Sequence, residues 1–248
     1  MDNTLYKEIF KRKSFHTFRE RINEAITQEE LNKIVDAFNS SERLFPDIKV
    51  AMEIKKSEGA NLFRNEEYCL RFFSERKPGY LQNVGYIGEQ LDLIITSMDI
   101  GSLWYGIAKS NDTLDGLDYV ILIAIAKVDK TKFRNDMFKA KRKEVSEMWE
   151  GDELNVANIV RFSPSACNSQ PWLVINKENE LSVYRKSKSG KVGIMPKDKS
   201  VFYNQIDIGI FMCILEICLA ENKIKYEREL FEDTQQFDEP VLNAKYKL

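Results

Sequence analysis

The segment Ser163 to Trp172, with the sequence SPSACNSQPW, carries more information about the fold than any other part of the chain. Pro164 presets the backbone angle of a turn, and the small residues after it keep the backbone clear of bulk. Asn168 and Gln170 alternate, so their carboxamides lie on one side, and Pro171 ends the loop before an apolar strand. Such a loop can present N–H groups, a hydroxyl and a carboxamide to the edge of a flat heteroaromatic ring. It can also be a turn whose polar side chains cap its own backbone.

Hydrophobic periodicity on both sides of this segment predicts helices and strands. The helices are expected near residues 5–10, from Thr27 to about 38, at 83–98 and at 206–221. Thr27 and Glu30 form a capping box at the start of the second of these. The strands are expected at residues 68–73, 119–126, 181–185 and 223–230. Gly101 is expected to end the helix at 83–98 in a turn, and residues 39–66 give no clear element.

Two parts of the chain show the same order of elements: a strand, then a largely buried helix, then another strand. The sequence itself does not repeat. The pattern alone leaves an internal duplication open. Residues 231–248 lack periodicity. The basic segment RKSKSGK at residues 185–191 is expected to be a hairpin tip.

Composition excludes several classes of protein. The 248 residues are 43% hydrophobic and 31% charged, which predicts a packed interior and argues against disorder. Lys+Arg is 37 against Asp+Glu 39, so the net charge of -2 argues against nucleic-acid binding through bulk positive charge. The single histidine, His16, excludes a multi-histidine zinc site and makes a Ser-His-Asp hydrolase improbable. We expect no metal.

The same sequence features predict a cytoplasmic protein. Its four cysteines form no CxxC pair and are expected to be reduced thiols. The N-terminus has no apolar signal core. The apolar runs at residues 119–126 and 208–220 are too short to span a membrane, so we expect no membrane contact.

The order of residues in PSACNSQPW resembles the PSAxNxQPW loop of the FMN-dependent nitroreductase family. In that family the loop reaches across a subunit boundary to the flavin. Three other segments are similar to family motifs: the N-terminal RKSFHTF at 12–18, the helix and IGSLW turn within 86–104, and the basic KRKE at 141–144. The resemblance covers roughly residues 5–230 and implies these flavin-binding residues: Arg12, Lys13, Ser14, His16, Gly101, Ser102, Arg142, Pro164, Ser165, Ala166, Asn168 and Gln170.

The resemblance also implies roles for some of these residues. Arg12 and Arg142 would hold the flavin phosphate, and His16 stands where the family has Arg or Lys near N1 and the C2 carbonyl of the flavin. No side chain is expected to be catalytic, because the flavin carries the chemistry. Purely structural roles remain open: the basic residues as solvated charges, Ser14 as a cap and His16 as an exposed helix-end residue. Cys167 is expected to be a small filler.

The activity that the resemblance implies is electron transfer from NADH or NADPH through FMN to a nitroaromatic, quinone or similar flat acceptor, in a ping-pong scheme. No GxGxxG follows a strand, and in this family the nicotinamide lies directly over the flavin. The PSACNSQPW loop follows the basic element at 141–144, an order that resembles the fused, two-half TM nitroreductase-like type. This type implies an α+β fold with a mixed sheet flanked by helices and two similar halves in one compact unit, at residues 1–150 and 151–230, with a C-terminal tail at 231–248. One chain would then hold one flavin as a monomeric pseudo-dimer, with a homodimer also possible. The alternatives are a non-catalytic flavin carrier or sensor of the same fold, or an interaction protein without flavin.

Overall fold

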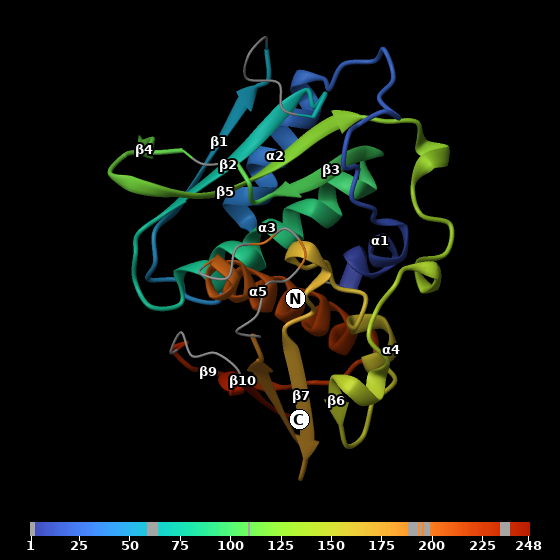
Figure 1. Ribbon diagram of the computed structural model, residues 1–248, viewed down its shortest axis with the longest axis vertical. Helices are drawn as coiled ribbons and strands as arrows, with labels where there is room; N and C mark the ends of the chain where they lie inside the picture. Colours follow the sequence, from blue (N-terminus) through green and yellow to red (C-terminus); the bar gives the residue numbers. More distant parts are fainter. Residues whose placement is uncertain are drawn as a thin grey trace.

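Two long helices, α3 (Tyr80–Ser97) and α5 (Ser200–Glu221), form the centre of the computed structural model. The structure describes residues 3–58, 64–108, 110–187, 193, 195, 199–233 and 239–248. The two helices lie side by side between an upper and a lower sheet (Figure 1). They can touch because each presents a glycine to the other. A Cβ atom on Gly85 would overlap the carbonyl oxygen of Ile206, and one on Gly209 would overlap that of Gln82.

The first sheet has the strand order β1-β2-β5-β3, formed by β1 (Val50–Lys56), β2 (Tyr68–Ser74), β5 (Leu117–Lys127) and β3 (Ile100–Tyr105). All its pairs are antiparallel, and the short β4 (Thr113–Leu114) pairs with β5. The central strand β5 is covered on both faces, as its continuous apolar run predicted. Ile121, Ile123 and Ile125 pack with α3 and α2 (Gln28–Ser40), whereas the alternate residues pack with Phe15 and Phe18.

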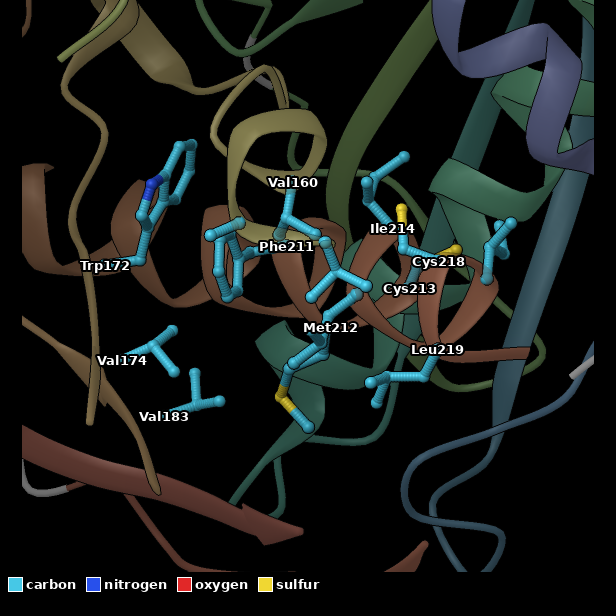
Figure 2. Close-up of a cluster of buried hydrophobic side chains, with 14 of the residues drawn as sticks. Val160, Trp172, Val174, Val183, Phe211, Met212, Cys213, Ile214, Cys218 and Leu219 are labelled. Carbon is cyan, nitrogen blue, oxygen red and sulfur yellow. The ribbon is translucent and has the colours of Figure 1, made fainter. Parts of the chain in front are cut away.

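The second sheet has the order β6-β7-β8-β10-β9. Its strands are β6 (Trp149–Glu150), β7 (Trp172–Lys177), β8 (Glu180–Arg185), β10 (Val241–Lys247) and β9 (Glu227–Leu230). Only the β6–β7 pair is parallel among these described strands. One face packs on α5, where the rings of Trp172 and Phe211 stack 5.0 Å apart beside Val174 and Val183 (Figure 2).

The connectivity of the first sheet recurs in the second. The chain runs β1, β2, α3, β3, β5 and later β7, β8, α5, β9, β10, and the sheet orders β1-β2-β5-β3 and β7-β8-β10-β9 correspond strand by strand. Gly85 and Gly209 occupy equivalent places in the two helices, because each meets the backbone of the other helix three residues before the other glycine. The predicted division into residues 1–150, 151–230 and a tail is not tested by this correspondence. We call β1, β2, α3, β3 and β5 the first half and β7, β8, α5, β9 and β10 the second half, each including the residues that lead into its first strand.

Most predicted elements are present. Thr27 caps α2 in a capping box with Glu30, as predicted. The α+β class is confirmed, with its strands in two sheets. The remaining short elements are η1 (Asn3–Leu5), α1 (Tyr6–Lys11), η3 (Lys130–Lys132), η4 (Met137–Lys139), η5 (Val145–Glu147), α4 (Ala157–Val160) and η6 (Ala166–Asn168).

One expectation about local structure was wrong, and two regions without a predicted element contain strands. Gly101 lies inside β3, and it is a glycine because a Cβ atom there would come within 2.9 Å of Phe15 and 2.8 Å of Val128. The region at 39–66 contains β1, and the expected tail at 231–248 contains β10, which pairs with two strands. The predicted hairpin tip at 185–191 lies partly outside the described residues, from 188 onward.

The helix α5 is longer than predicted. Its 22 residues are long and apolar enough to cross a membrane, and 89% of its most apolar stretch is buried inside the protein. An apolar helix that is covered on all sides by protein is a core helix.

Candidate functional site

A cavity of about 750 Å³ lies between the two halves. This volume is within the range of small-molecule and cofactor sites. The first half contributes the N-terminal segment after α1 and the end of β3, and the second half contributes the Ser163–Trp172 loop and α5. The residues from these four elements are Arg12, Ser14, His16, Leu103, Trp104, Tyr105, Gly106, Ile107, Pro164, Ser165, Ala166, Cys167, Tyr203, Ile206, Asp207 and Ile210.

Flat and apolar side chains form much of the cavity wall. Ile206 and Ile210 project from α5, and the indole of Trp104 stacks on Phe72 at a centroid distance of 6.4 Å. The hydroxyl of Tyr203 donates to the carbonyl oxygen of Gly106, which fastens α5 to the end of β3. The wall is therefore apolar, rigid and built from both halves, which suits a planar aromatic ligand.

The N-terminal segment presents alternate residues to the cavity. Helix α1 ends at Lys11 with Arg12 as its C-cap, and Ser14 then forms a parallel bridge with Ser102 of β3. In extended backbone, successive side chains point to opposite sides. Arg12, Ser14 and His16 accordingly line the cavity, whereas Phe15 is buried and the Nζ of Lys13 donates to the Lys132 carbonyl, 3.0 Å away.

Arg12 is held by two buried acids of α3. Its Nε donates to Oδ2 of Asp92 at 2.6 Å, and Oε1 of Glu89 lies 3.7 Å away. Ser102 and the indole of Trp104 also donate to Asp92. Burial raises the pKa of Glu89 well above its ordinary value, against the charge of Arg12, which lowers it, and the charge of Asp92 raises it further.

A group of arginines lies next to Arg12. Burial, then the charges of Arg134, Arg12 and Arg161, lower the pKa of Arg142 to about 10. Burial and Arg12 likewise lower the pKa of Arg134. Within the described chain, no carboxylate comes within 4.0 Å of Arg134, Arg142 or Arg161, and the buried Nε of Arg142 has no hydrogen-bond partner. Uncompensated positive charge of this kind is typical of a site for an anion such as phosphate.

The polar groups of the Ser163–Trp172 loop bond mainly to the protein. The N–H of Gln170 donates to Oγ of Ser165 at 3.0 Å, and Oε1 of Gln170 accepts from the N–H of Lys143 at 2.7 Å. Asn168 accepts from Arg142 through Oδ1 at 2.9 Å. These two carboxamides therefore face the basic segment around Lys143, and only the first part of the loop lines the cavity.

The predicted site residues thus fall into two groups. The structure brings Arg12, Ser14, His16, Pro164, Ser165 and Ala166 together around the cavity. Lys13, Gly101, Ser102, Arg142, Asn168 and Gln170 are not among the residues that line it. Cys167 is exposed and also lines the cavity.

Sequence reasoning missed three buried acids: Glu89, Asp92 and Asp207. Asp207 is 3% exposed, lines the cavity, and accepts the N–H of Ala166 at 2.9 Å. Burial raises its pKa to about 7, against three hydrogen bonds that lower it. All three acids lie within helices that periodicity predicts to be buried. A charged residue within a buried helix is uncommon, and this signal in the sequence could have identified them.

Comparisons with known proteins agree with this geometry. A family model described as "Putative TM nitroreductase" matches residues 4–219. No curated protein matches the sequence. Among solved structures, a protein named as a "putative nitroreductase" from Thermotoga maritima aligns with a TM-score of 0.63 over 98% of this chain and 93% of its own, at 19% identity, which shows a shared fold.

Other solved structures cover a smaller part of the chain. A "putative NADH dehydrogenase/NAD(P)H nitroreductase" from Parabacteroides distasonis covers 59% of this chain and 97% of its own, with 12% identity and a TM-score of 0.44. A "putative nitroreductase in complex with FMN" from Desulfovibrio desulfuricans covers 59% and 95%, with 14% identity and a TM-score of 0.43.

Proposed function

The chain belongs to the family described as "Putative TM nitroreductase", and from this premise we propose that it is an FMN-dependent oxidoreductase that passes electrons from NADH or NADPH to a nitroaromatic, quinone or similar flat acceptor. The observation that carries the proposal is the cavity between the halves. It joins Arg12, Ser14 and His16 to the Pro164–Ala166 part of the loop, which are segments that resemble flavin-binding motifs.

The residues at the cavity fit FMN. The apolar walls from Trp104, Ile206 and Ile210 match a planar ring system. The arginine group beside Arg12 offers donors to a phosphate, including the unpartnered Nε of Arg142. When bound, FMN supplies two-electron redox chemistry that no side chain provides.

The chain's own residues would bind and orient. Arg12, Arg134 and Arg142 would hold the phosphate, and His16 would donate a hydrogen bond to the polar edge of the ring. The Tyr203–Gly106 hydrogen bond would hold α5 and the end of β3 together at the cavity. Nicotinamide and acceptor would occupy the remaining space in turn, which is the basis of the ping-pong scheme.

One chain supplies both walls of the cavity, so we expect a monomer to bind one FMN in the cytoplasm. The test is to titrate purified protein with FMN, measure its mass by light scattering, and follow NADH and NADPH oxidation with menadione. One FMN per monomer and acceptor-dependent oxidation are expected. A protein that takes up no FMN would refute the proposal, and FMN bound only by a dimer would refute the monomeric site.

The second candidate is a flavin carrier or sensor without turnover. The ion pair of Arg12 with Asp92 favours it, because the carboxylate offsets positive charge beside the cavity. FMN bound at one equivalent without oxidation of either nicotinamide would select this candidate.

A further inference from the structure

The Ser163–Trp172 loop has a backbone conformation that needs outside support. Cys167, Asn168 and Gln170 all have positive φ angles, of 51°, 54° and 48°. Residues other than glycine rarely adopt this backbone conformation, and it is kept only where neighbouring groups stabilise it. The loop therefore depends on contacts with other elements to keep its shape as a cavity wall.

Asp207 of α5 supplies the main contact to the cavity side of the loop. Its Oδ1 accepts the N–H of Ala166 at 2.9 Å, and its Oδ2 lies 3.3 Å from Oγ of Ser169. Asn204, one turn earlier on α5, donates through Nδ2 to both Oδ2 of Asp207 and Oγ of Ser169, each at 3.0 Å. One carboxylate thus ties two points of the loop to α5.

A buried chain of hydrogen bonds supports this carboxylate from the second sheet. Oγ of Ser187 donates to Oδ1 of Asn204 at 2.9 Å, which turns the Asn204 amide so that its NH₂ faces Asp207. Arg185 of β8 donates to Ser187 and makes a two-point ion pair with Asp233, at 2.6 and 2.7 Å. Asn204 and Arg185 are 1% and 0% exposed, so the chain is fixed in place.

We propose that Asp207 is a positioning residue, which holds the Ser163–Trp172 loop in the conformation that binds FMN, with Asn204 and Arg185 fixing Asp207 in turn. The FMN part of this inference rests on the proposed function. The loop part does not, because it rests on the hydrogen bonds between the loop and Asp207 alone.

The support depends on the charge of Asp207. Donors converge on both of its oxygens, so the ionised form holds the loop best. Burial places its pKa at about 7, so protonation occurs close to neutral pH. A proton on Oδ2 displaces a donor and loosens the loop. The charged groups around it are Arg12, His16, Arg64 and Lys199 on the same cavity, Glu89 and Asp92 on α3, and the Arg185–Asp233 pair behind Asn204.

The first half offers a matched control. Asn83 precedes Gly85 by two residues, as Asp207 precedes Gly209. Its Oδ1 accepts the N–H of Leu44 at 2.9 Å and of Phe45 at 3.2 Å, so it anchors the corresponding loop of the first half. Asn83 is fully buried and does not line the cavity.

The experiment compares Asp207→Ala, Asp207→Asn and Asn83→Ala by thermal unfolding, by hydrogen exchange of the Ala166 amide without ligand, and by FMN titration. Both alanine variants should lower Tm. Only Asp207→Ala should accelerate Ala166 exchange and weaken FMN binding, each about tenfold, because a hydrogen bond to a charged group is lost at the loop.

Asp207→Asn keeps the size of the side chain and removes its charge. Between pH 6 and 8, wild-type Ala166 exchange, corrected for the intrinsic rate, should slow as pH rises, whereas the variant should show no such change. FMN affinity should follow the same pattern after the pH dependence that both proteins share is subtracted.

Two results would overturn the inference: FMN affinity and Ala166 exchange in Asp207→Ala that match Asn83→Ala, or a pH dependence in Asp207→Asn equal to that of the wild type. Failure of the wild type to bind FMN would refute the proposed function alone, since Ala166 exchange still decides whether Asp207 holds the loop. Where Asp207→Ala does not fold, the pH profile of Asp207→Asn decides.

Discussion

The two halves have the same order of strands and helix. Equivalent positions lie beside the cavity in one half and inside a closed core in the other. Asp92 and Glu216 each stand seven residues after the glycine at the helix crossing. Asp92 pairs with Arg12, which lines the cavity. Glu216 lies in a closed cluster, where it accepts hydrogen bonds from the hydroxyls of Tyr86, Tyr226 and Tyr246 and from Arg228, at 2.6–2.8 Å.

The residue after each glycine shows the same contrast. Ile210 lines the cavity, whereas the larger Tyr86 is fully buried and packs with Leu44 and Phe45. Side chains thus fill the space beside α3 that corresponds to the cavity beside α5. Of these two equivalent places, one is the open cavity around Arg12 and Asp207, and the other is the packed core around Tyr86 and Glu216.

The largest expected effect concerns the packed side. Glu216→Ala leaves three tyrosine hydroxyls and the Arg228 charge without their shared acceptor. Breaking a buried ion pair by removing one partner costs about 3–5 kcal/mol. We expect a loss of that size in the free energy of unfolding by urea. A loss under about 1 kcal/mol, the range of exposed ion pairs, would show that the cluster does not stabilise this half.

The next effect concerns pH and the open side. The pKa of Asp207 is raised from 3.8 to about 7 in the folded protein, so between these values the folded state binds more protons than the unfolded state. Its contribution therefore makes the fold less stable as pH rises from about 4 to about 7, by on the order of 4 kcal/mol, and constant above that. Other acids add slopes of their own, so the measurement is the difference between wild type and Asp207→Asn. Parallel curves of stability against pH for the two proteins would contradict the raised pKa.

The helix crossing should be more sensitive than a surface glycine. A Cβ atom on Gly209 would strike the backbone of α3, and overpacking of this kind costs about 1–3 kcal/mol or more. Gly116→Ala is the control, because φ there is +79° with nothing within 4 Å, so only the backbone cost of about 1–2 kcal/mol applies. Thermal unfolding should show the larger shift for Gly209→Ala, and a further loss of FMN affinity if the halves separate. A smaller shift than that of Gly116→Ala would mean that the helices can move apart freely.

Periodicity predicted the elements that are buried in a simple way. The run at residues 119–126 became β5, and the Thr27–Glu30 pair became the cap of α2. It missed β10 because a bulge between Leu242 and Ala244 interrupts the alternation of the strand. Gly101 was assigned to a turn because the close approach of Phe15, which requires a glycine there, comes from a distant segment.

The site was predictable where side chains follow a local rule or a motif. The alternation of Arg12, Ser14 and His16 follows from extended backbone, and the resemblance identified the loop. Asp92 and Asp207 were missed because periodicity treats a buried helix as uniformly apolar, and their roles arise only when the helix meets Arg12 and Ala166 in space.

The smallest expected effect tests whether the open side binds an anion. Arg142→Ala removes one of several cations beside Arg12, so we expect FMN affinity to fall about tenfold, the value of one charge-assisted hydrogen bond. Stability should change little or rise, since burial, and after it the neighbouring positive charges, destabilise the protonated guanidinium in the wild type. Arg76→Ala is the control, because Arg76 is 63% exposed and pairs with Asp118. Equal affinity in both variants would place the phosphate elsewhere. A loss of affinity that disappears with riboflavin, which lacks the phosphate, would assign the arginine group to that end of the ligand and leave the ring to the apolar walls of the cavity.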